Sequence, residues 1–407
     1  MNDNFIYSPL KFVYKGNYFD SIEEFLDCVD GVELDKSGLY DYLRLGFIGF
    51  GSTFVKGLSY DRPWALSPIS EYDSQNISTK SAFEIFESRV SEFSKFQSVV
   101  LPLSGGLDSS LIAYFLKGKS NLEAFTYSVD FDQRDSYELR ARDFCRKYNL
   151  SWCQVALSDY FSLTDEWVNL FGSSMHAHGM YQLDFYKKIR SNTISRNLIS
   201  GIIGDALAGS TSKVSIPGKP DELYLYTHGL SLTSEMAKYA TGINKSVYAE
   251  REYYEKNAYF NTKKKLALYI IRSKMMLLRY LVDLPSSLGF VVDSPFLYSD
   301  VAEAFLSIEN KFWDNRRWQF DFCKKYSVFP EQLHYRKENT LHNYSILRHK
   351  FNPLDIDLFS KVFKKGFLID LNLVASRSYA NFSPSALRFK NAYLILKPLE
   401  KFLSKLS

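Results

Sequence analysis

The stretch Val99–Gly118, "VVLPLSGGLDSSLIAYFLKG", contains an apolar run that stops abruptly at two glycines. The run 98–103 predicts a fully buried strand, and the residues after Asp108 predict a helix. Glycines between a strand and a helix let the backbone pass close to a bulky ligand without a Cβ clash. The stretch therefore predicts a ligand-binding turn that joins a strand to a helix.

The segments around this turn alternate between strand and helix patterns. Predicted strands lie at 98–103, 122–129, 151–157 and 196–203, and predicted helices lie at 81–96, 109–118, 136–150 and 180–192. This alternation predicts an α/β fold with a doubly wound parallel sheet. Ser81 and Glu84 predict a capping box at the start of the first helix. Residues 66–80 are polar and predict a linker, and beyond about residue 220 the pattern becomes helical.

The chemistry of the turn favours a phosphate chain with a divalent cation. A helix that begins near Ser109 directs its free N–H groups and its positive dipole end at an anion in front of it. The hydroxyls of Ser104, Ser109 and Ser110 add donors to this site. Asp108 would repel phosphates unless a cation such as Mg²⁺ lies between them.

The composition excludes several other classes of protein. The 407 residues are 46% hydrophobic and 24% charged, and the formal net charge is +4. So small a positive excess lacks the concentrated basic face of a nucleic-acid binder, and no apolar run is long enough to span a membrane. The first residues lack an export-signal pattern, so we expect a cytoplasmic protein with no nucleic-acid or membrane partner.

The four cysteines are scattered along the chain without a CxxC pair; they are Cys28, Cys145, Cys153 and Cys323. This spacing argues against a zinc site, a redox motif and a disulfide framework. We therefore expect reduced cysteines packed as small apolar residues.

The loop is not a Walker motif, and no GxGxxG is present. The run "LSGGLDSSL" at 103–111 resembles the pyrophosphate loop of N-type ATP pyrophosphatases (the PP-loop superfamily), in the asparagine-synthetase form. Three further stretches resemble that family: "LISGIIGDALAGS" at 198–210, "VVDSPFLYSDVAEAFLSI" at 291–308 and "FPEQLHYRKEN" at 329–339. Upstream, "LYDYLRLGFIGFGSTFVKGL" at 39–58 resembles the end of the family's glutaminase domain.

The resemblance implies a fold, a division of the chain and a set of site residues. Residues 76–407 would form an adenine-nucleotide-alpha-hydrolase-like synthetase domain, and residues 1–75 would be a truncated glutaminase-like segment without a catalytic cysteine. ATP would be the nucleotide. Its implied binding residues are Leu103, Ser104, Gly105, Gly106, Asp108, Ser109, Ser110, Tyr127, Ser200 and Gly201. Asp108 and Asp205 would hold Mg²⁺, and Lys337 would stabilise the reacting adenylate, with Arg336 as a fallback.

The implied reaction is an ATP-dependent amide ligation that forms AMP and diphosphate. A carboxylate is adenylated and then passed to ammonia or an amine. Ile202, Ala206, Asp293 and Tyr298 depart from the family pattern where the acid or the amine would be handled. The resemblance therefore favours an acid other than aspartate, such as a sugar uronate, a peptide or a specialised-metabolite acid. The nitrogen would come from ammonia, a separate glutaminase or an amine on a second substrate.

Three alternatives stay open at this stage. One is asparagine synthesis from aspartate itself. A second is other chemistry on the same loop, such as RNA base thiolation or lysidine formation, although paired cysteines and a basic surface are missing. The third is a nucleotide-binding protein that has lost the second half-reaction, which Ile202 and Ala206 favour.

A pair of histidines carries the remaining chemistry. His176 and His178 are two of six histidines and precede the predicted helix at 180–192. They would contact a polar or sugar substrate, serve as a base, or be ordinary loop residues. The sequence offers no further ligands that would make this pair a metal site.

Overall fold

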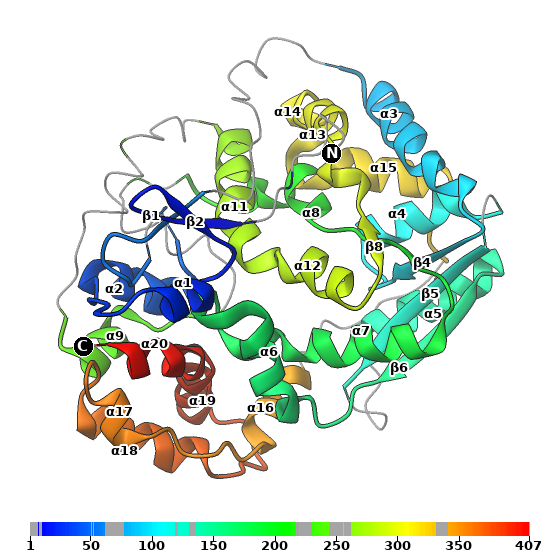
Figure 1. Ribbon diagram of the computed structural model, residues 1–407. Coiled ribbons are helices and arrows are strands. Elements are labelled where there is room, and N and C mark those ends of the chain that lie inside the picture. The colour runs from blue at the N-terminus through cyan, green and yellow to red at the C-terminus, as the bar shows by residue number, and fades with distance from the viewer. Residues whose placement is uncertain are drawn as a thin grey trace.

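A five-stranded parallel sheet runs through the right-hand half of the computed structural model as seen in Figure 1. The structure describes residues 7, 10–49, 51, 53–61, 77–118, 121–129, 136–216, 218, 230–243, 255, 262–330 and 341–406. The strands are β4 (Ser98–Pro102), β5 (Asn121–Ser128), β6 (Ser151–Ala156), β7 (Asn197–Ile199) and β8 (Val291–Asp293). Their order is β6-β5-β4-β7-β8. Strands β5 and β6 follow on one side of β4, whereas β7 and β8 lie on its other side. The order in which the strands are added therefore reverses between β4 and β7, and doubly wound folds bind their ligands at this point.

Successive residues of the strands enter two different hydrophobic cores. Val99 and Leu101 of β4 pack into one core, whereas Val100 between them packs into the other. Leu198 and Ile199 of β7 divide in the same way. Side chains alternate between the faces of a strand, so a continuous apolar run is required where helices cover both faces. This burial explains why the run 99–103 is apolar throughout.

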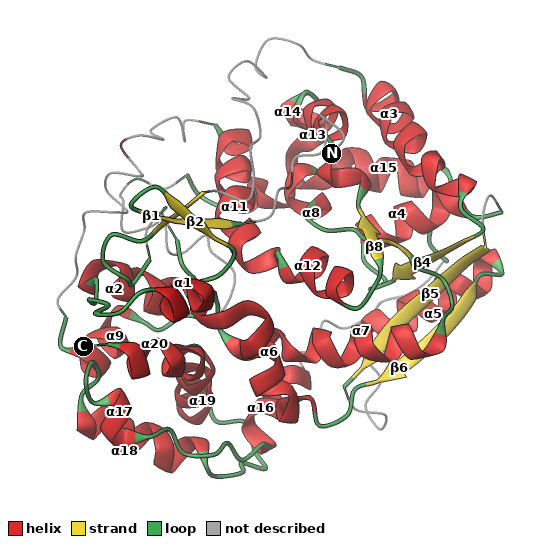
Figure 2. Cartoon of the chain, in the orientation of Figure 1, coloured by secondary structure: helices red, strands yellow, loops and turns green. Residues whose placement is uncertain are grey.

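Helices cover both faces of the sheet and predominate elsewhere (Figure 2). The first core contains α3 (Thr79–Ser91), α4 (Leu107–Leu116), α5 (Ser136–Tyr148), α8 (Gly204–Leu207), α13 (Ser299–Leu306), α14 (Asn310–Trp313) and α15 (Arg317–Lys325). The second core contains α6 (Thr164–Phe171), α7 (Met180–Asn192) and helices from both ends of the chain. Helices α11 (Lys263–Leu278) and α12 (Tyr280–Ser287) contribute to both cores.

The N-terminal residues pack against the C-terminal helices. Strands β1 (Lys11–Tyr14), β2 (Asn17–Phe19) and β3 (Ser59–Asp61) form an antiparallel sheet of order β2-β1-β3 beside α1 (Ile22–Cys28) and α2 (Lys36–Leu45). The C-terminal helices are α16 (Leu341–Arg348), α17 (Ile356–Phe359), α18 (Lys365–Ala375), α19 (Pro384–Leu396) and α20 (Glu400–Lys405), and α9 (Ser234–Thr241) packs in the same core. The Tyr42 hydroxyl donates to the carbonyl of Ile395 at 2.9 Å. The two ends of the chain thus share one core (Figure 1).

The predicted doubly wound α/β fold is confirmed, with several local corrections. The cap of α3 is Ser78, whose Oγ accepts the N–H of Ser81, so the predicted capping box at Ser81 is wrong. The stretch 291–308 opens with β8, a strand that the helical pattern concealed. Cys28 is exposed rather than packed, whereas Cys145 and Cys323 are buried. The N-terminal sheet was not predicted.

Most of the predicted linker at 66–80 lies outside the described residues. In the described part of the chain, no helix has the length and apolar character needed to cross a membrane.

Candidate active site

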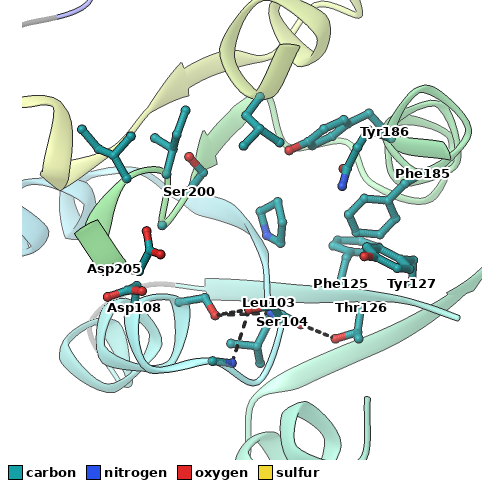
Figure 3. A pocket seen from close by; sticks show the side chains of 18 of the residues that line it. Leu103, Ser104, Asp108, Phe125, Thr126, Tyr127, Phe185, Tyr186, Ser200 and Asp205 are labelled. Atoms are coloured by element: carbon teal, nitrogen blue, oxygen red, sulfur yellow. Dashed lines mark hydrogen bonds between the residues drawn. The ribbon is translucent and has the colours of Figure 1, made fainter. Parts of the chain in front are cut away.

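A cavity of about 520 Å³ opens at the carboxyl ends of β4, β5 and β7 (Figure 3). Most of the residues that the sequence assigned to a nucleotide site line this one cavity: Leu103, Ser104, Gly106, Asp108, Ser109, Tyr127, Ser200, Gly201 and Asp205. They come from segments as far apart as residues 103 and 205, so the parallel sheet brings them together. The volume lies in the range of small-molecule sites, roughly 300–1,000 Å³.

The remaining predicted residues lie elsewhere. Gly105 forms the turn with a positive φ of 68° and is not among the residues that line the cavity. Ser110 is fully buried beneath the loop. Lys337 and its fallback Arg336 lie outside the described residues, so their assignment stays a prediction.

The loop is held by its own serines. The Ser104 N–H donates to Ser109 Oγ at 3.3 Å, and the Gly106 N–H donates to Ser104 Oγ at 3.3 Å. The two hydroxyl oxygens of Ser104 and Ser109 lie 3.2 Å apart. Within the described residues no side chain caps α4, whose N-cap is Gly106. The first N–H groups of α4 therefore keep their capacity to bind an anion.

The turn after β7 approaches this loop closely. A Cβ at Gly201 would lie 3.2 Å from the Ser109 nitrogen and 3.3 Å from the Asp108 Cβ. The Ser200 N–H donates to the carbonyl of Asp293 in β8 at 3.0 Å, which fixes the end of β7. A side chain at position 201 would therefore crowd the first turn of α4.

Ile203 adopts a backbone conformation that β-branched residues rarely take. Its φ is +57°, it is 5% exposed, and it lies in the cavity wall beside Ile202. An L-residue in this left-handed region costs roughly 1–2 kcal/mol. The turn that carries Asp205 into α8 therefore keeps a shape that glycine would adopt at lower cost.

Asp108 is a buried carboxylate of the site whose pKa is raised. Burial raises the pKa of Asp108 to about 6, and the neighbouring Asp205 carboxylate also raises it. Arg316 and Gln319 oppose this shift through charge and hydrogen bonding. The Arg316 guanidinium forms an ion pair with Asp108 Oδ1, and both side chains are largely shielded from solvent. Sequence reasoning did not identify Arg316, because "DNRRW" at 314–318 resembles an ordinary charged surface turn.

Two tryptophans position Arg316. The Trp313 indole donates to the carbonyl of Leu207 at 2.8 Å, and the Trp318 indole donates to the carbonyl of Ala208 at 3.1 Å. These bonds attach α14 and α15 to the end of α8, the helix that carries Asp205. The two carboxylates and the arginine thus belong to one tightly connected cluster.

The far end of the cavity is aromatic. Phe125, Tyr127, Phe185 and Tyr186 surround it, opposite Asp108 and Asp205 (Figure 3). The Tyr127 ring lies edge-on to Phe185, with centroids 5.3 Å apart. The cavity therefore has a polar end at the loop and an apolar end suited to a flat ring.

The predicted histidine pair does not line the cavity. His176 is buried, and its N–H donates to the carbonyl of Gly46 at 2.7 Å, which joins the N-terminal segment to the centre of the protein. The His178 ring lies edge-on to His342, with centroids 6.2 Å apart, and His342 in turn contacts Tyr127. Burial lowers the pKa of His178 to about 3 and that of His342 to about 4, so both rings are neutral near pH 7.

Residues 91–281, which include β4 to β7 and the loop, match a family model described as asparagine synthase. This segment is an asparagine synthase domain. The chain matches no curated protein sequence. The stretches 39–58, 291–308 and 329–339 lie outside the matched residues, so their resemblance to the family stays a prediction.

Two solved structures resemble the chain that carries this asparagine synthase domain. One is the NH₃-dependent NAD synthetase from Campylobacter jejuni, with 15% identity, a TM-score of 0.28, and coverage of 50% of this chain and 96% of that one. The other is the glutamine-dependent NAD⁺ synthetase from Acinetobacter baumannii in complex with ADP. It has 15% identity, a TM-score of 0.23, and coverage of 66% of this chain and 62% of that one.

Proposed function

We propose that the protein is an ATP-dependent, AMP-forming carbon–nitrogen ligase. It would adenylate a carboxylic acid and pass the acyl group to ammonia or an amine. The observation that carries the proposal is the loop 104–110 at the β4/β7 switch point, with Asp108 and Asp205 on one side of a nucleotide-sized cavity. Its location inside an asparagine synthase domain supports the same chemistry.

The polar end of the cavity would hold the phosphates. The hydroxyls of Ser104 and Ser109 and the first N–H groups of α4 would donate to the β- and γ-phosphates. Gly105 and Gly106 would keep side chains away from them. Leu103, Tyr127, Ser200 and Gly201 would surround the ribose and the base, because they end neighbouring strands beside the aromatic half of the cavity.

The residues at the polar end fit a magnesium ion. Asp108 and Asp205 are close enough for one carboxylate to raise the pKa of the other, and a cation between them would relieve that repulsion. Among the described residues there is no cluster of three or more His, Cys, Asp or Glu side chains. Mg²⁺ is commonly held by one or two carboxylates together with substrate phosphates, which matches this donor set. When bound, it would supply charge stabilisation for the departing diphosphate.

The first half-reaction would be attack of a substrate carboxylate oxygen on the α-phosphorus of ATP. The bond from the α-phosphorus to the bridging oxygen breaks, and diphosphate leaves while the loop donors stabilise its charge. In the second step a nitrogen attacks the acyl carbon, and AMP leaves. Lys337 is our proposed stabiliser of the charge on the adenylate. Position 202, where a general base for the incoming amine could stand, is an apolar isoleucine that lines the cavity.

The acid is proposed to differ from aspartate, for example a sugar uronate or a specialised-metabolite acid. The buried Ile202 replaces a polar group in the wall, and Ala206 is buried behind it. The Tyr298 hydroxyl donates to Asp293 Oδ2 at 2.8 Å, so the two departures at 291–308 satisfy each other. The nitrogen would come from ammonia, from a separate glutaminase that releases it, or from an amine on a second substrate. The reaction would take place in the cytoplasm.

The same apolar wall favours a second candidate function. A protein with Ile202 and Ile203 at the cavity could bind the nucleotide and lack the amide-forming step. ATP binding without turnover distinguishes this candidate from a ligase.

Exchange of labelled diphosphate into ATP, measured with Mg²⁺ across a panel of amino acids, uronic acids and peptide acids, tests the proposal. We expect exchange with one class of acid, lost in Asp108→Ala and on chelation of Mg²⁺. Asp321→Ala, which removes an exposed carboxylate of α15, is the matched control and should retain exchange. ATP binding with no exchange for any acid would favour the second candidate, and failure to bind ATP would refute both.

A further inference from the structure

One face of α7 presents polar groups to the aromatic end of the cavity. Gln182, Phe185 and Tyr186 stand at positions i, i+3 and i+4, which share a helix face, and all three line the cavity. Figure 3 shows the rings of Phe185 and Tyr186 with Phe125 and Tyr127 around this end. The face therefore combines aromatic rings with an amide and a hydroxyl.

Gln182 is a buried residue, and its amide has no hydrogen-bond partner in the described part of the chain. The residue is 9% exposed, and among the described residues its side chain makes no hydrogen bond. The same holds for the Tyr186 hydroxyl, which belongs to a residue 2% exposed. Both residues line the cavity, so the amide and the hydroxyl are open to a molecule inside it. Such groups are expected to be satisfied by a ligand that enters the cavity.

The amide selects the chemistry of that ligand. A carboxamide offers one donor and one acceptor side by side, which pairs with the amino group and adjacent ring nitrogen of adenine. The four rings supply the stacking surface that a purine requires. The triphosphate of the same molecule would reach Ser104 and Asp108 at the opposite end of the cavity (Figure 3).

We propose that Gln182 recognises the adenine base by a paired hydrogen bond to its exocyclic amino group and a neighbouring ring nitrogen. This inference rests on the proposed use of ATP and assigns the residue that selects the base. Because it concerns equilibrium binding, it does not depend on the identity of the acid.

The test compares ATP with purine riboside triphosphate, which lacks the amino group, by equilibrium titration with Mg²⁺ present. Wild-type protein should bind ATP about tenfold more tightly, which corresponds to one hydrogen-bond pair of about 1.4 kcal/mol. Gln182→Met keeps the length and volume of the side chain and should bring the ratio to about one by weakening ATP. Gln154→Met, a glutamine of β6 that does not line the cavity, is the matched control and should keep the wild-type ratio.

The outcomes separate the inference from the proposed function. Equal affinity for the two nucleotides in wild-type protein, or an unchanged preference in Gln182→Met, would overturn the role of Gln182 and leave ATP binding intact. No binding of either nucleotide by wild-type protein would refute the use of ATP together with the inference. Should Gln182→Met fail to fold, as judged by its circular dichroism, the wild-type pair of affinities still decides whether the amino group is read.

Discussion

Arg316 and Arg317 are neighbours in the sequence and meet very different surroundings. Arg316 pairs with the shielded Asp108, whereas Arg317 lies 3.6 Å from Asp321, with both side chains more than half exposed. The desolvated pair stabilises the fold only while both partners are present, because removing one leaves a buried charge. An exposed pair contributes little in water.

Replacing each arginine by methionine should therefore give different results. We expect Arg316→Met to lower the free energy of unfolding by about 3 kcal/mol at pH 8, where Asp108 is ionised. Arg317→Met should change it by less than about 0.5 kcal/mol. Urea denaturation of both variants measures the difference. Equal losses would show that the Arg316–Asp108 pair is no better shielded than a surface pair.

A partly buried histidine, His178, predicts how stability depends on pH. Burial holds the pKa of His178 near 3, whereas an unfolded histidine titrates near 6.5. Below pH 6.5 the unfolded chain binds a proton that the native chain does not, so stability falls as the pH falls. Between pH 7 and pH 5 this amounts to about 2 kcal/mol for such a histidine.

His178→Phe retains a ring and removes the titration. Its midpoint of thermal unfolding should fall less than that of the wild type between pH 7 and pH 5. His349→Phe is a useful comparison, because that ring is only half-buried and its pKa is lowered less decisively. If His178→Phe loses as much stability on acidification as the wild type, the ring is not held neutral by burial.

Among the elements, the connection that leaves α8 depends on one glycine. Gly209 has a φ of +104°, and a Cβ there would lie 2.0 Å from the carbonyl oxygen of Trp313. That carbonyl belongs to the segment that positions Arg316. An added methyl group must therefore displace the backbone and distort the polar end of the cavity.

Gly209→Ala should lower the free energy of unfolding by about 2–3 kcal/mol, since it adds a strained backbone to a clash. Gly366→Ala is the control: this exposed residue in the first turn of α18 has no atom within 4 Å of the added Cβ. Alanine has the higher helix propensity, so that variant should gain about 0.5 kcal/mol. Thermal unfolding of the two proteins checks both signs. A neutral Gly209→Ala would mean that the turn adapts without strain.

The elements also show how far the sequence could predict the fold. Long periodic helices such as α7 and apolar strands such as β4 follow directly from local pattern, and the loop between β4 and α4 determines where the cavity opens. β8 has three residues, too few for any periodicity, and forms because Val291–Asp293 pairs with β7. Ser78 rather than Ser81 caps α3, because the Ser78 hydroxyl accepts the N–H of Ser81, three residues further along the chain.

The sequence predicted those residues of the candidate site that belong to one short motif. It did not predict residues that come from distant parts of the sequence and meet only in the folded protein. Ser104, Asp108 and Asp205 belong to recognisable motifs. Arg316 reaches Asp108 only because two tryptophans attach α14 and α15 to α8, and no local pattern records that arrangement. Gln182 looks like a polar position of an amphipathic helix until the cavity in front of it is known.

At the scale of the whole molecule, two cores share one sheet. The core around the loop contains α4 and α8, and the other joins the N-terminal segment to the C-terminal helices. In that second core, Phe54 and Phe402 lie with ring centroids 4.8 Å apart, and both are fully buried. The domain boundary that we propose at residue 75 therefore lies between parts of the sequence whose side chains pack in the same core.

Phe402→Ala tests whether the two cores unfold together. Loss of a buried phenylalanine costs about 3–5 kcal/mol, so we expect a clearly lower unfolding midpoint. Leu373→Ala removes a half-exposed side chain of α18 and should change stability by less than about 0.5 kcal/mol.

Because alternate residues of β4 enter each core, the loss at Phe402 should lower the stability of the cavity side as well. Far-ultraviolet circular dichroism and the fluorescence of bound nucleotide analogue should then report one transition at the same temperature. Two separate transitions, with only one shifted by Phe402→Ala, would show that the sheet does not couple the cores and that the N-terminal segment and C-terminal helices form a unit of their own.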